Sequence, residues 1–184
     1  MVTKDFSEIR STELVQKSGL TILAGCPASG KTTYALKLAK ECAIDAQTPT
    51  AYFSLGMSDK QLLNRLIVNM GEVSGEKIRN DQLTKEEWAQ LETKMQELYG
   101  AKLYIDDSPS IAINELCSKC RQMVKGQGIK MVIIDYLQLM CKEDDHHRKG
   151  EMSAILQSLN TLAEELDISI LALCQDYNDI KIDD

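Results

Sequence analysis

The sequence lacks the features that mark membrane, secreted and nucleic-acid-coating proteins. No apolar run approaches the roughly 20 residues that a membrane-spanning helix needs, and the charged N-terminus carries no secretory leader. Proline occurs only 3 times and glycine 10 times, so no long flexible linker is evident. A net charge of −7 argues against a broad basic surface for nucleic acid. These absences predict a cytoplasmic protein with no membrane contact.

The 6 cysteines follow no disulfide framework. They stand at Cys26, Cys42, Cys117, Cys120, Cys141 and Cys174. A reducing compartment would keep them as free thiols. Two of them form a C-x-x-C within a segment of helical periodicity, and no second pair follows. This pattern favours buried thiols, and the alternative is a zinc site that includes His146 and His147.

What the chain does contain is an alternation of apolar strands and amphipathic helices. Its 184 residues are 43% hydrophobic and 27% charged, the balance of one folded domain. Continuous apolar runs, typical of strands buried on both faces, occupy 20–25, 50–55, 102–107, 130–135 and 168–173. Helical periodicity lies between them, over 31–42, 59–70, 84–98, 114–124 and 151–166. The order predicts an α/β fold of three layers, in which helices cover both sides of a mostly parallel sheet.

The third predicted helix has a recognisable start. Thr84 and Glu87 fit a capping box, in which each side chain bonds a backbone N–H at the helix N-terminus. Apolar residues then recur at intervals of three and four, at Trp88, Leu91, Met95 and Leu98. This spacing predicts one buried face, with Trp88 as a core anchor rather than a stacking platform.

The segment GCPASGKT, residues 25–32, fits the phosphate-loop pattern G-x-x-x-x-G-K-[ST] without a departure. Glycine is needed where a Cβ would collide with the polyphosphate or where φ is positive. Successive N–H groups and the following helix N-terminus then point at the anion. Lys31 would contact the β- and γ-phosphates, and Thr32 would supply an oxygen to Mg²⁺. The loop follows an apolar strand and opens a helix, which favours this interpretation over an ordinary glycine-rich turn.

The second requirement of such a site is a carboxylate at the end of another strand. In KMVIID, residues 130–135, four apolar residues are followed by Asp135. This pattern is typical of a strand whose terminal carboxylate holds the water shell of the metal. The alternative role for Asp135 is a loop cap. Asp106 and Asp107 end another strand, but they precede SPS and indicate turn chemistry.

Taken together, several segments resemble the ATPase domain of DnaB-type replicative DNA helicases. The resemblance is carried by LTILAGCPASGKTTYALKLA, YFSLGMSDKQLLNRL, KIRNDQLTKEEW, LYIDDSPSI, VIIDYLQLM, GEMSAILQSLNTLAEEL and ILALCQD, which occur in the family's order. It implies a RecA-like P-loop NTPase core. We expect one partial domain over 1–184, with a lead-in at 1–19, a core at 20–176 and a tail at 177–184.

The resemblance also assigns roles to residues. The nucleotide-binding residues would be Gly25, Ala28, Ser29, Gly30, Lys31, Thr32 and Thr33, with ATP and Mg²⁺ as cofactors. Thr32 and Asp135 would hold the metal, and Lys31, Asp135 and Gln175 would act in catalysis. Gln175 matches the family's polar sensor at a strand end, and the alternative is a solvent-facing amide.

The chain departs from the family in three respects. The family's S-L-E-M has a Glu that positions the attacking water, and here that residue is Gly56, which has no side chain to accept a proton. Asp59 is the nearest substitute, but it is better interpreted as a helix N-cap. The chain ends at Asp184, before the family's further strands, DNA-gripping loop and basic finger. The segment 175–184 is acidic, which disfavours DNA there.

These features leave three functional hypotheses. The first is a degenerate helicase ATPase domain that binds ATP and Mg²⁺ with impaired hydrolysis and unwinding, for which single-stranded DNA is a family partner. The second is a non-catalytic module that docks on a helicase ring or its loader. The third is a small P-loop kinase. Because the missing strands would flank 20–25, that strand would form an exposed edge, so we expect self-association, a covering segment or poor stability.

Overall fold

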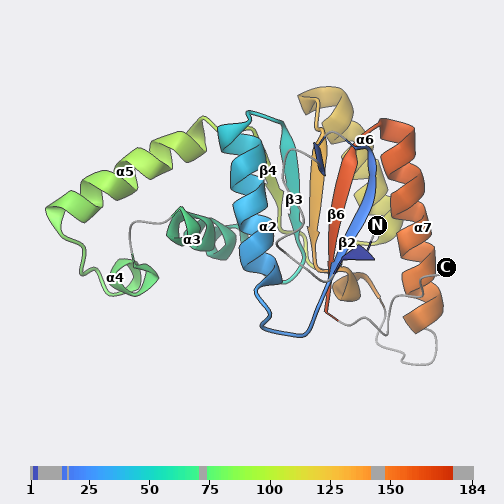
Figure 1. Ribbon diagram of the computed structural model, residues 1–184, viewed down its shortest axis with the longest axis horizontal. Coiled ribbons are helices and arrows are strands. Elements are labelled where there is room, and N and C mark those ends of the chain that lie inside the picture. The colour runs from blue at the N-terminus through green and yellow to red at the C-terminus, as the bar shows by residue number, and fades with distance from the viewer. Residues whose placement is uncertain (1, 4–13, 16, 71–73, 142–147, 176–184) are drawn as a thin grey trace.

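The computed structural model describes residues 2–3, 14–15, 17–70, 74–141 and 148–175. Its centre is a 6-stranded sheet in the order β1–β2–β6–β5–β3–β4, in which every neighbouring pair is parallel (Figure 1). The strands are β1 Val2–Thr3, β2 Gly19–Ala24, β3 Thr50–Ser54, β4 Leu103–Asp106, β5 Met131–Asp135 and β6 Ser169–Cys174. The five predicted strands are therefore confirmed, each end within about one residue of its expected place, as continuous apolar runs in an α/β chain would suggest.

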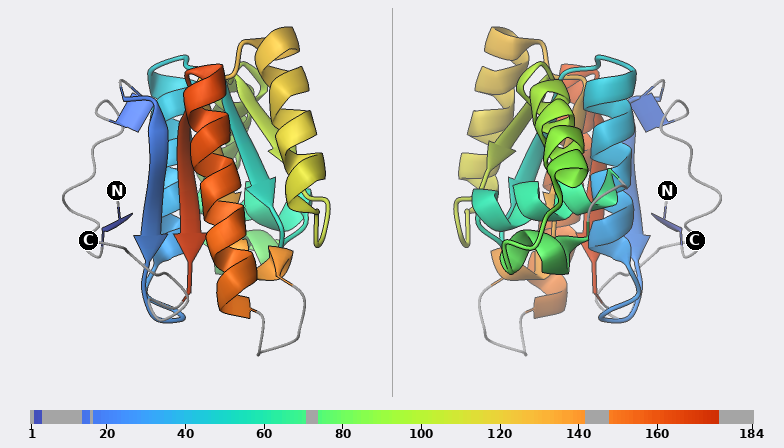
Figure 2. Two further views of the ribbon diagram at one scale, coloured as in Figure 1. Left: turned by 90° about the vertical axis from the view of Figure 1, so that its right-hand side faces the viewer. Right: turned by 90° about the vertical axis from the view of Figure 1, so that its left-hand side faces the viewer.

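Helices cover both faces of the sheet. They are α2 Lys31–Lys40, which continues as the π-helical turn η2 Glu41–Asp45, α3 Asp59–Asn69, α4 Gly75–Arg79, α5 Lys85–Tyr99, α6 Ile113–Gln127, the 3₁₀ turn η3 Leu137–Met140 and α7 Arg148–Leu166. Figure 2 shows α6 and α7 on one face and α2 and α3 on the other, which confirms the three layers. Within the described residues, no helix is long and apolar enough to cross a bilayer.

Each face of the sheet packs against its own helices and buries its own apolar side chains. Successive strand residues alternate between the two faces. Tyr52, Ile133 and Leu171 pack with α2 and α3, and their neighbours along each strand pack with α6 and α7. Asp135 follows Ile133 by two residues, so it lies on the α2 side at the carboxyl end of β5. The sheet thus presents this carboxylate toward the start of α2.

A short strand covers part of the outer edge of β2. β1 pairs with it in parallel, with Val2 opposite Ile22 and Thr3 opposite Leu23. One of the three consequences expected for an exposed edge, a covering segment, is therefore present over two residues. It comes from the predicted lead-in 1–19, which the sequence pattern left outside the core.

The prediction that Trp88 anchors the core is wrong. The capping box is as predicted, because Thr84 Oγ1 accepts from the Glu87 N–H at 3.2 Å and Glu87 Oε2 accepts from the Thr84 N–H at 2.9 Å. However, α5 projects away from the sheet (Figure 1), and Trp88 remains 50% exposed. The apolar spacing identifies a helix face but not what covers it.

Cys117 and Cys120 are buried on α6, as the sequence pattern favoured. Burial raises the pKa of the Cys120 thiol to about 12 and also raises that of Cys117. Both are therefore protonated, unreactive core groups at neutral pH. His146 and His147, the other members of the alternative zinc set, lie outside the described residues.

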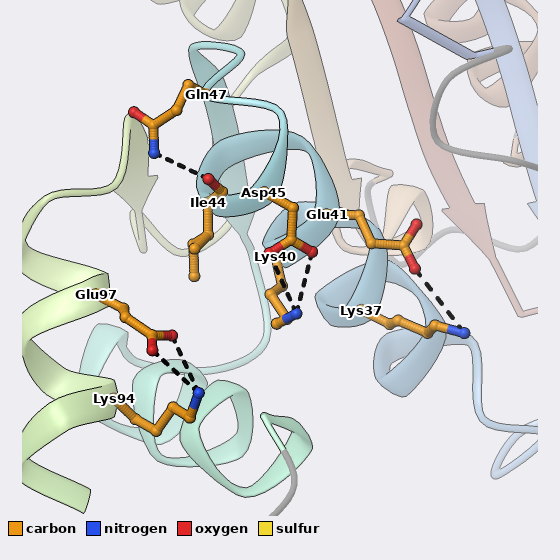
Figure 3. Close-up of polar contacts among 8 residues, drawn as sticks. All are labelled: Lys37, Lys40, Glu41, Ile44, Asp45, Gln47, Lys94 and Glu97. Carbon is orange, nitrogen blue, oxygen red and sulfur yellow. Dashed lines mark hydrogen bonds and ion pairs between the residues drawn. The ribbon is translucent and has the colours of Figure 1, made fainter. Parts of the chain in front are cut away.

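Charged side chains collect at the far end of α2 from the phosphate loop (Figure 3). Lys40 Nζ lies 3.0 Å from Asp45 Oδ2, and Lys37 Nζ lies 3.9 Å from Glu41 Oε1. Basic side chains in the last turn of a helix complement its negative end. All of these groups are well away from the helix start, where the candidate site lies.

An ion pair ties the end of β4 to α6 and gives a prediction on stability. Lys119 Nζ donates to Asp106 Oδ2 at 2.6 Å and to Ser108 Oγ at 2.9 Å, and the Ser108 N–H donates to Asp106 Oδ1 at 3.0 Å. Burial alone would raise the pKa of Asp106, but the hydrogen bonds from Lys119 and Ser108 outweigh it and lower that pKa. The turn chemistry predicted for Asp106 is confirmed.

We expect Lys119→Met to lower the free energy of unfolding at pH 7 by about 1–2 kcal/mol, between the contribution of an exposed ion pair and that of a buried hydrogen bond to a charged group, because both side chains are partly exposed. Because the folded-state pKa of Asp106 is lowered, its contribution is complete above the unfolded value of about 4 and is lost as pH falls through the folded value. Urea unfolding should therefore show the difference between wild type and Lys119→Met shrinking below about pH 4. Lys125→Met, on the same helix, is the control, and an equal loss there or a pH-independent difference would contradict this account.

Candidate nucleotide-binding site

The loop between β2 and α2 has the backbone of an anion cradle. Gly30, the N-cap of α2, has φ +89°, and Ala28 has φ +61°. A Cβ on Gly25 would lie 3.1 Å from Ser29 Oγ, so the loop closes tightly over that residue. No side chain caps the start of α2, and its first turn contains no acidic residue. The N–H groups and the positive end of the helix dipole are therefore available to an anion.

Lys31 lies folded against this loop. Its Nζ donates to Gly25 O at 2.6 Å, to Cys26 O at 2.7 Å and to Ser29 Oγ at 3.2 Å, and the residue is buried. Burial lowers the pKa of the ammonium group, and the nearby Asp135 acts in the opposite direction. The loop carbonyls thus hold a cation next to the cradle, where phosphate oxygens could replace them as acceptors.

Asp135 lies across from the start of α2. Its Oδ1 accepts from Thr32 Oγ1 at 3.3 Å, and its Oδ2 accepts from the Tyr52 hydroxyl at 3.0 Å. Burial raises the pKa of this carboxyl, while the hydrogen bonds from Tyr52 and Thr32 work against that rise. A hydroxyl and a carboxylate oxygen side by side form the hard oxygen donor set that Mg²⁺ prefers.

These groups line one cavity of about 290 Å³. Its walls are residues 27–33 together with Arg65, Asp135, Tyr136 and Gln175. The structure therefore brings together every predicted site residue of the loop except Gly25, along with Asp135 and Gln175 from two strand ends. Gly25 lies under the loop and contributes its carbonyl oxygen to Lys31. The cradle, the cation and the oxygen donors fit a magnesium–nucleoside triphosphate in kind and in placement.

Comparison with known sequences gives the family. A sequence profile described as the DnaB-like helicase C terminal domain matches residues 2–179. The chain belongs to this family. It is 39% identical over 173 residues to the replicative DNA helicase DnaB of Geobacillus stearothermophilus and 36% identical over 173 residues to the replicative DNA helicase DnaC of Bacillus subtilis. Each match covers 92% of this chain and 38% of the relative, so the chain spans well under half the length of these helicases.

Solved structures agree on the RecA-like fold. One solved ATPase domain superposes with a TM-score of 0.78 at 30% identity, over 95% of this chain and 68% of that one. A DnaB-like replicative helicase, described with its interactions with primase, gives 0.76 at 31% identity over 90% of this chain and 42% of that one. A KaiC-like protein of Pyrococcus horikoshii shares the fold, with a TM-score of 0.56 at 18% identity.

Gly56, the position at which the sequence resemblance predicts Glu, lies beside the cavity of this DnaB-like domain through its contact with Tyr136. It is exposed just after β3, and a Cβ built on it would lie 3.5 Å from Tyr136 Cε1 and 3.1 Å from Leu139 Cδ1. Tyr136 lines the cavity. A side chain at position 56 would therefore contact Tyr136, a residue that lines the cavity. Glycine places no carboxylate there.

Asp59 is not among the residues that line this cavity, and its predicted role as an N-cap is wrong by one residue. Ser58 caps α3 in a capping box with Gln61, and Asp59 lies in the first turn. Its backbone N–H donates to Asp107 Oδ2 at 2.9 Å. Ser58, one residue earlier, also offers a side-chain oxygen that can cap a helix. The sequence pattern alone therefore does not distinguish Ser58 from Asp59 as the N-cap. Asp107 thus serves as a structural acceptor at the end of β4.

Three residues of the site escaped the sequence interpretation. Arg65 of α3 lines the cavity, and its charge opposes the rise that burial causes in the pKa of Asp135. Tyr136 lines the cavity next to Asp135, and Tyr52 bonds Asp135 from the core side. The sequence feature that could have indicated Arg65 is its position on α3, the helix that follows β3, directly before the buried Leu66. Nothing in the pattern separated Tyr52 from an ordinary strand tyrosine.

Proposed function

We propose that the chain binds ATP with Mg²⁺ through the loop 25–33, Lys31, Thr32 and Asp135, and hydrolyses it slowly. The observation that supports binding is the cavity in which an uncapped helix start, a buried lysine and a paired hydroxyl and carboxylate face one another. Family membership makes ATP the first candidate ligand. When bound, Mg²⁺ would neutralise phosphate charge, and the residues that would hold it are Thr32 and Asp135.

Slow turnover follows from Gly56. Water attack on a phosphate benefits from a positioned base, and losing one costs on the order of 10²–10⁴ in rate. The groups beside Gly56 are the apolar Leu139 and the aromatic edge of Tyr136, and neither accepts a proton from water. Gln175 lines the cavity and would act as the polar sensor of the γ-phosphate. The site is thus better equipped to hold a triphosphate than to cleave it.

Titration with a fluorescent ATP analogue, with and without Mg²⁺, tests the binding proposal. We expect saturable binding that is competed by ATP and strengthened by Mg²⁺. Binding that Mg²⁺ leaves unchanged, or no binding at all, would refute the assignment. Adding single-stranded DNA tests whether this partner, expected from the family alone, changes nucleotide affinity.

A second candidate function is docking on a full-length helicase ring or a loader. The observation that favours it is the exposed apolar surface of α5, where Trp88 is 50% exposed and Tyr99 83% exposed. Exposed aromatic side chains are frequent anchors at protein interfaces. The helicase in the primase complex is a relative of this chain, and binding to the host's helicase, to primase or to a second copy would distinguish the possible partners.

A further inference from the structure

The phenol of Tyr52 approaches Asp135 from inside the protein. Tyr52 belongs to β3 and is fully buried in the core between the sheet and the helices α2 and α3. Its hydroxyl donates to Asp135 Oδ2 at 3.0 Å, away from the oxygen that faces Thr32. A buried tyrosine hydroxyl normally has a partner, and here that partner is a carboxylate of the candidate metal site.

Strand register explains why Tyr52 can reach this carboxylate. β3 and β5 are adjacent and parallel, with Tyr52 opposite Ile133 and Ser54 opposite Asp135. Tyr52 and Asp135 therefore lie on the same face of the sheet, and Tyr52 starts two residues short of Asp135. A phenol ring extended toward the carboxyl ends of the strands spans that offset. Shorter strand side chains at position 52 would leave Oδ2 buried without this donor.

We propose that Tyr52 is a positioning residue that sets which oxygen of Asp135 faces the metal. With Oδ2 held by the phenol, Oδ1 is directed to Thr32. The Thr32 hydroxyl donates its only hydrogen to Asp135 Oδ1, so the lone pairs of Thr32 Oγ1 remain available to a cation. The two hydrogen bonds, from Tyr52 to Asp135 and from Thr32 to Asp135, thus fix the positions of Asp135 Oδ1 and Thr32 Oγ1 before the ligand binds.

The burial of Tyr52 makes this orientation firm. The ring is packed on all sides, with 0% of its surface exposed, and cannot turn away as a surface side chain could. Groups that hold a metal ligand in place typically change metal affinity 10- to 100-fold when they are removed. Tyr52→Phe keeps the ring and deletes only the hydroxyl. The inference rests on the proposed function, since it concerns the metal that accompanies the nucleotide.

The experiment compares wild type and Tyr52→Phe in two titrations. In the first, a fluorescent ATP analogue is added without metal, and we expect the two dissociation constants to agree within about twofold. In the second, Mn²⁺ is added to the protein with bound ATP and free Mn²⁺ is counted by electron paramagnetic resonance. We expect Tyr52→Phe to bind Mn²⁺ about 10-fold more weakly, at the lower end of the range for such groups.

Tyr104→Phe is the matched control, because Tyr104 lies on the next strand and packs against the core on the α6 and α7 side. It should leave both titrations unchanged. Wild-type metal affinity in Tyr52→Phe would overturn the inference, and so would an equal loss in both titrations, which would indicate a merely structural hydroxyl. If Tyr52→Phe does not fold, Tyr52→Met is subject to the same criteria. Absence of nucleotide binding in the wild type would instead refute the proposed function.

Discussion

We expect that replacing Lys31 by Ala weakens binding of ATP with Mg²⁺ by about 100-fold or more. The ammonium group would make at least two hydrogen bonds to phosphate oxygens, each worth roughly 1.5 kcal/mol or more, which together exceed a factor of 100. The loop already holds Nζ at the mouth of the cradle through Gly25 O and Cys26 O, so little of this energy is lost in ordering the side chain. Isothermal titration calorimetry measures the change.

Lys37→Ala is the control for Lys31→Ala. Both lysines are on α2, but the Lys37 side chain is 69% exposed and faces Glu41 at 3.9 Å (Figure 3). Its removal should leave the dissociation constant unchanged within about twofold, because a surface pair at this distance contributes little. Equal effects of the two substitutions would show that charge in general, rather than the cradle, attracts the nucleotide. Thermal melting without ligand checks that Lys31→Ala is folded.

Gly56→Glu is expected to raise the rate of ATP hydrolysis by about 10-fold or more, since a positioned base contributes on the order of 10²–10⁴ and a newly placed one recovers part of it. The new carboxylate would start beside Tyr136, which lines the cavity. Steady-state phosphate release under saturating ATP, with and without single-stranded DNA, gives the rate. A wild-type rate that DNA stimulates strongly, unchanged by Gly56→Glu, would contradict slow hydrolysis.

The surroundings of Gly56 supply the controls. Its added Cβ would lie 3.1 Å from Leu139 Cδ1, so the leucine must move for the new side chain to settle. Combining Gly56→Glu with Leu139→Ala removes this contact, and we expect the double variant to be at least as fast as the single one. Gly56→Gln has nearly the same shape without the basic oxygen. An equal gain from Gln would show that filling the space, rather than supplying a base, increases the rate.

The central part of the fold could be predicted from local patterns. Strands buried on both faces must be continuously apolar, so β2, β3, β5 and β6 stand out from the amphipathic helices between them. The phosphate loop and Asp135 were also predictable, because their chemistry needs fixed residue types directly after a strand. Because the strands are parallel, the phosphate loop after β2 and Asp135 at the end of β5 both lie at the carboxyl ends of the strands, where the cavity is found.

Other features depended on contacts that no local pattern contains. Trp88 has the spacing of a core residue, but α5 leaves the sheet and exposes it. Arg65 and Tyr52 join the site through packing of α3 and pairing of β3 with β5. β1 is only two residues long, which is too short for any hydrophobic period, so the sequence pattern could not reveal its pairing with β2.

A crystal structure of the chain with Mg²⁺ and a non-hydrolysable ATP analogue tests the central claim most directly. We predict the triphosphate on the loop 25–33, with Lys31 Nζ moved from Gly25 O and Cys26 O to the phosphates and with Thr32 and Asp135 facing the metal. A cradle left empty at saturating analogue, with Lys31 still on the two carbonyl oxygens, would contradict the assignment of this cavity as a nucleotide site.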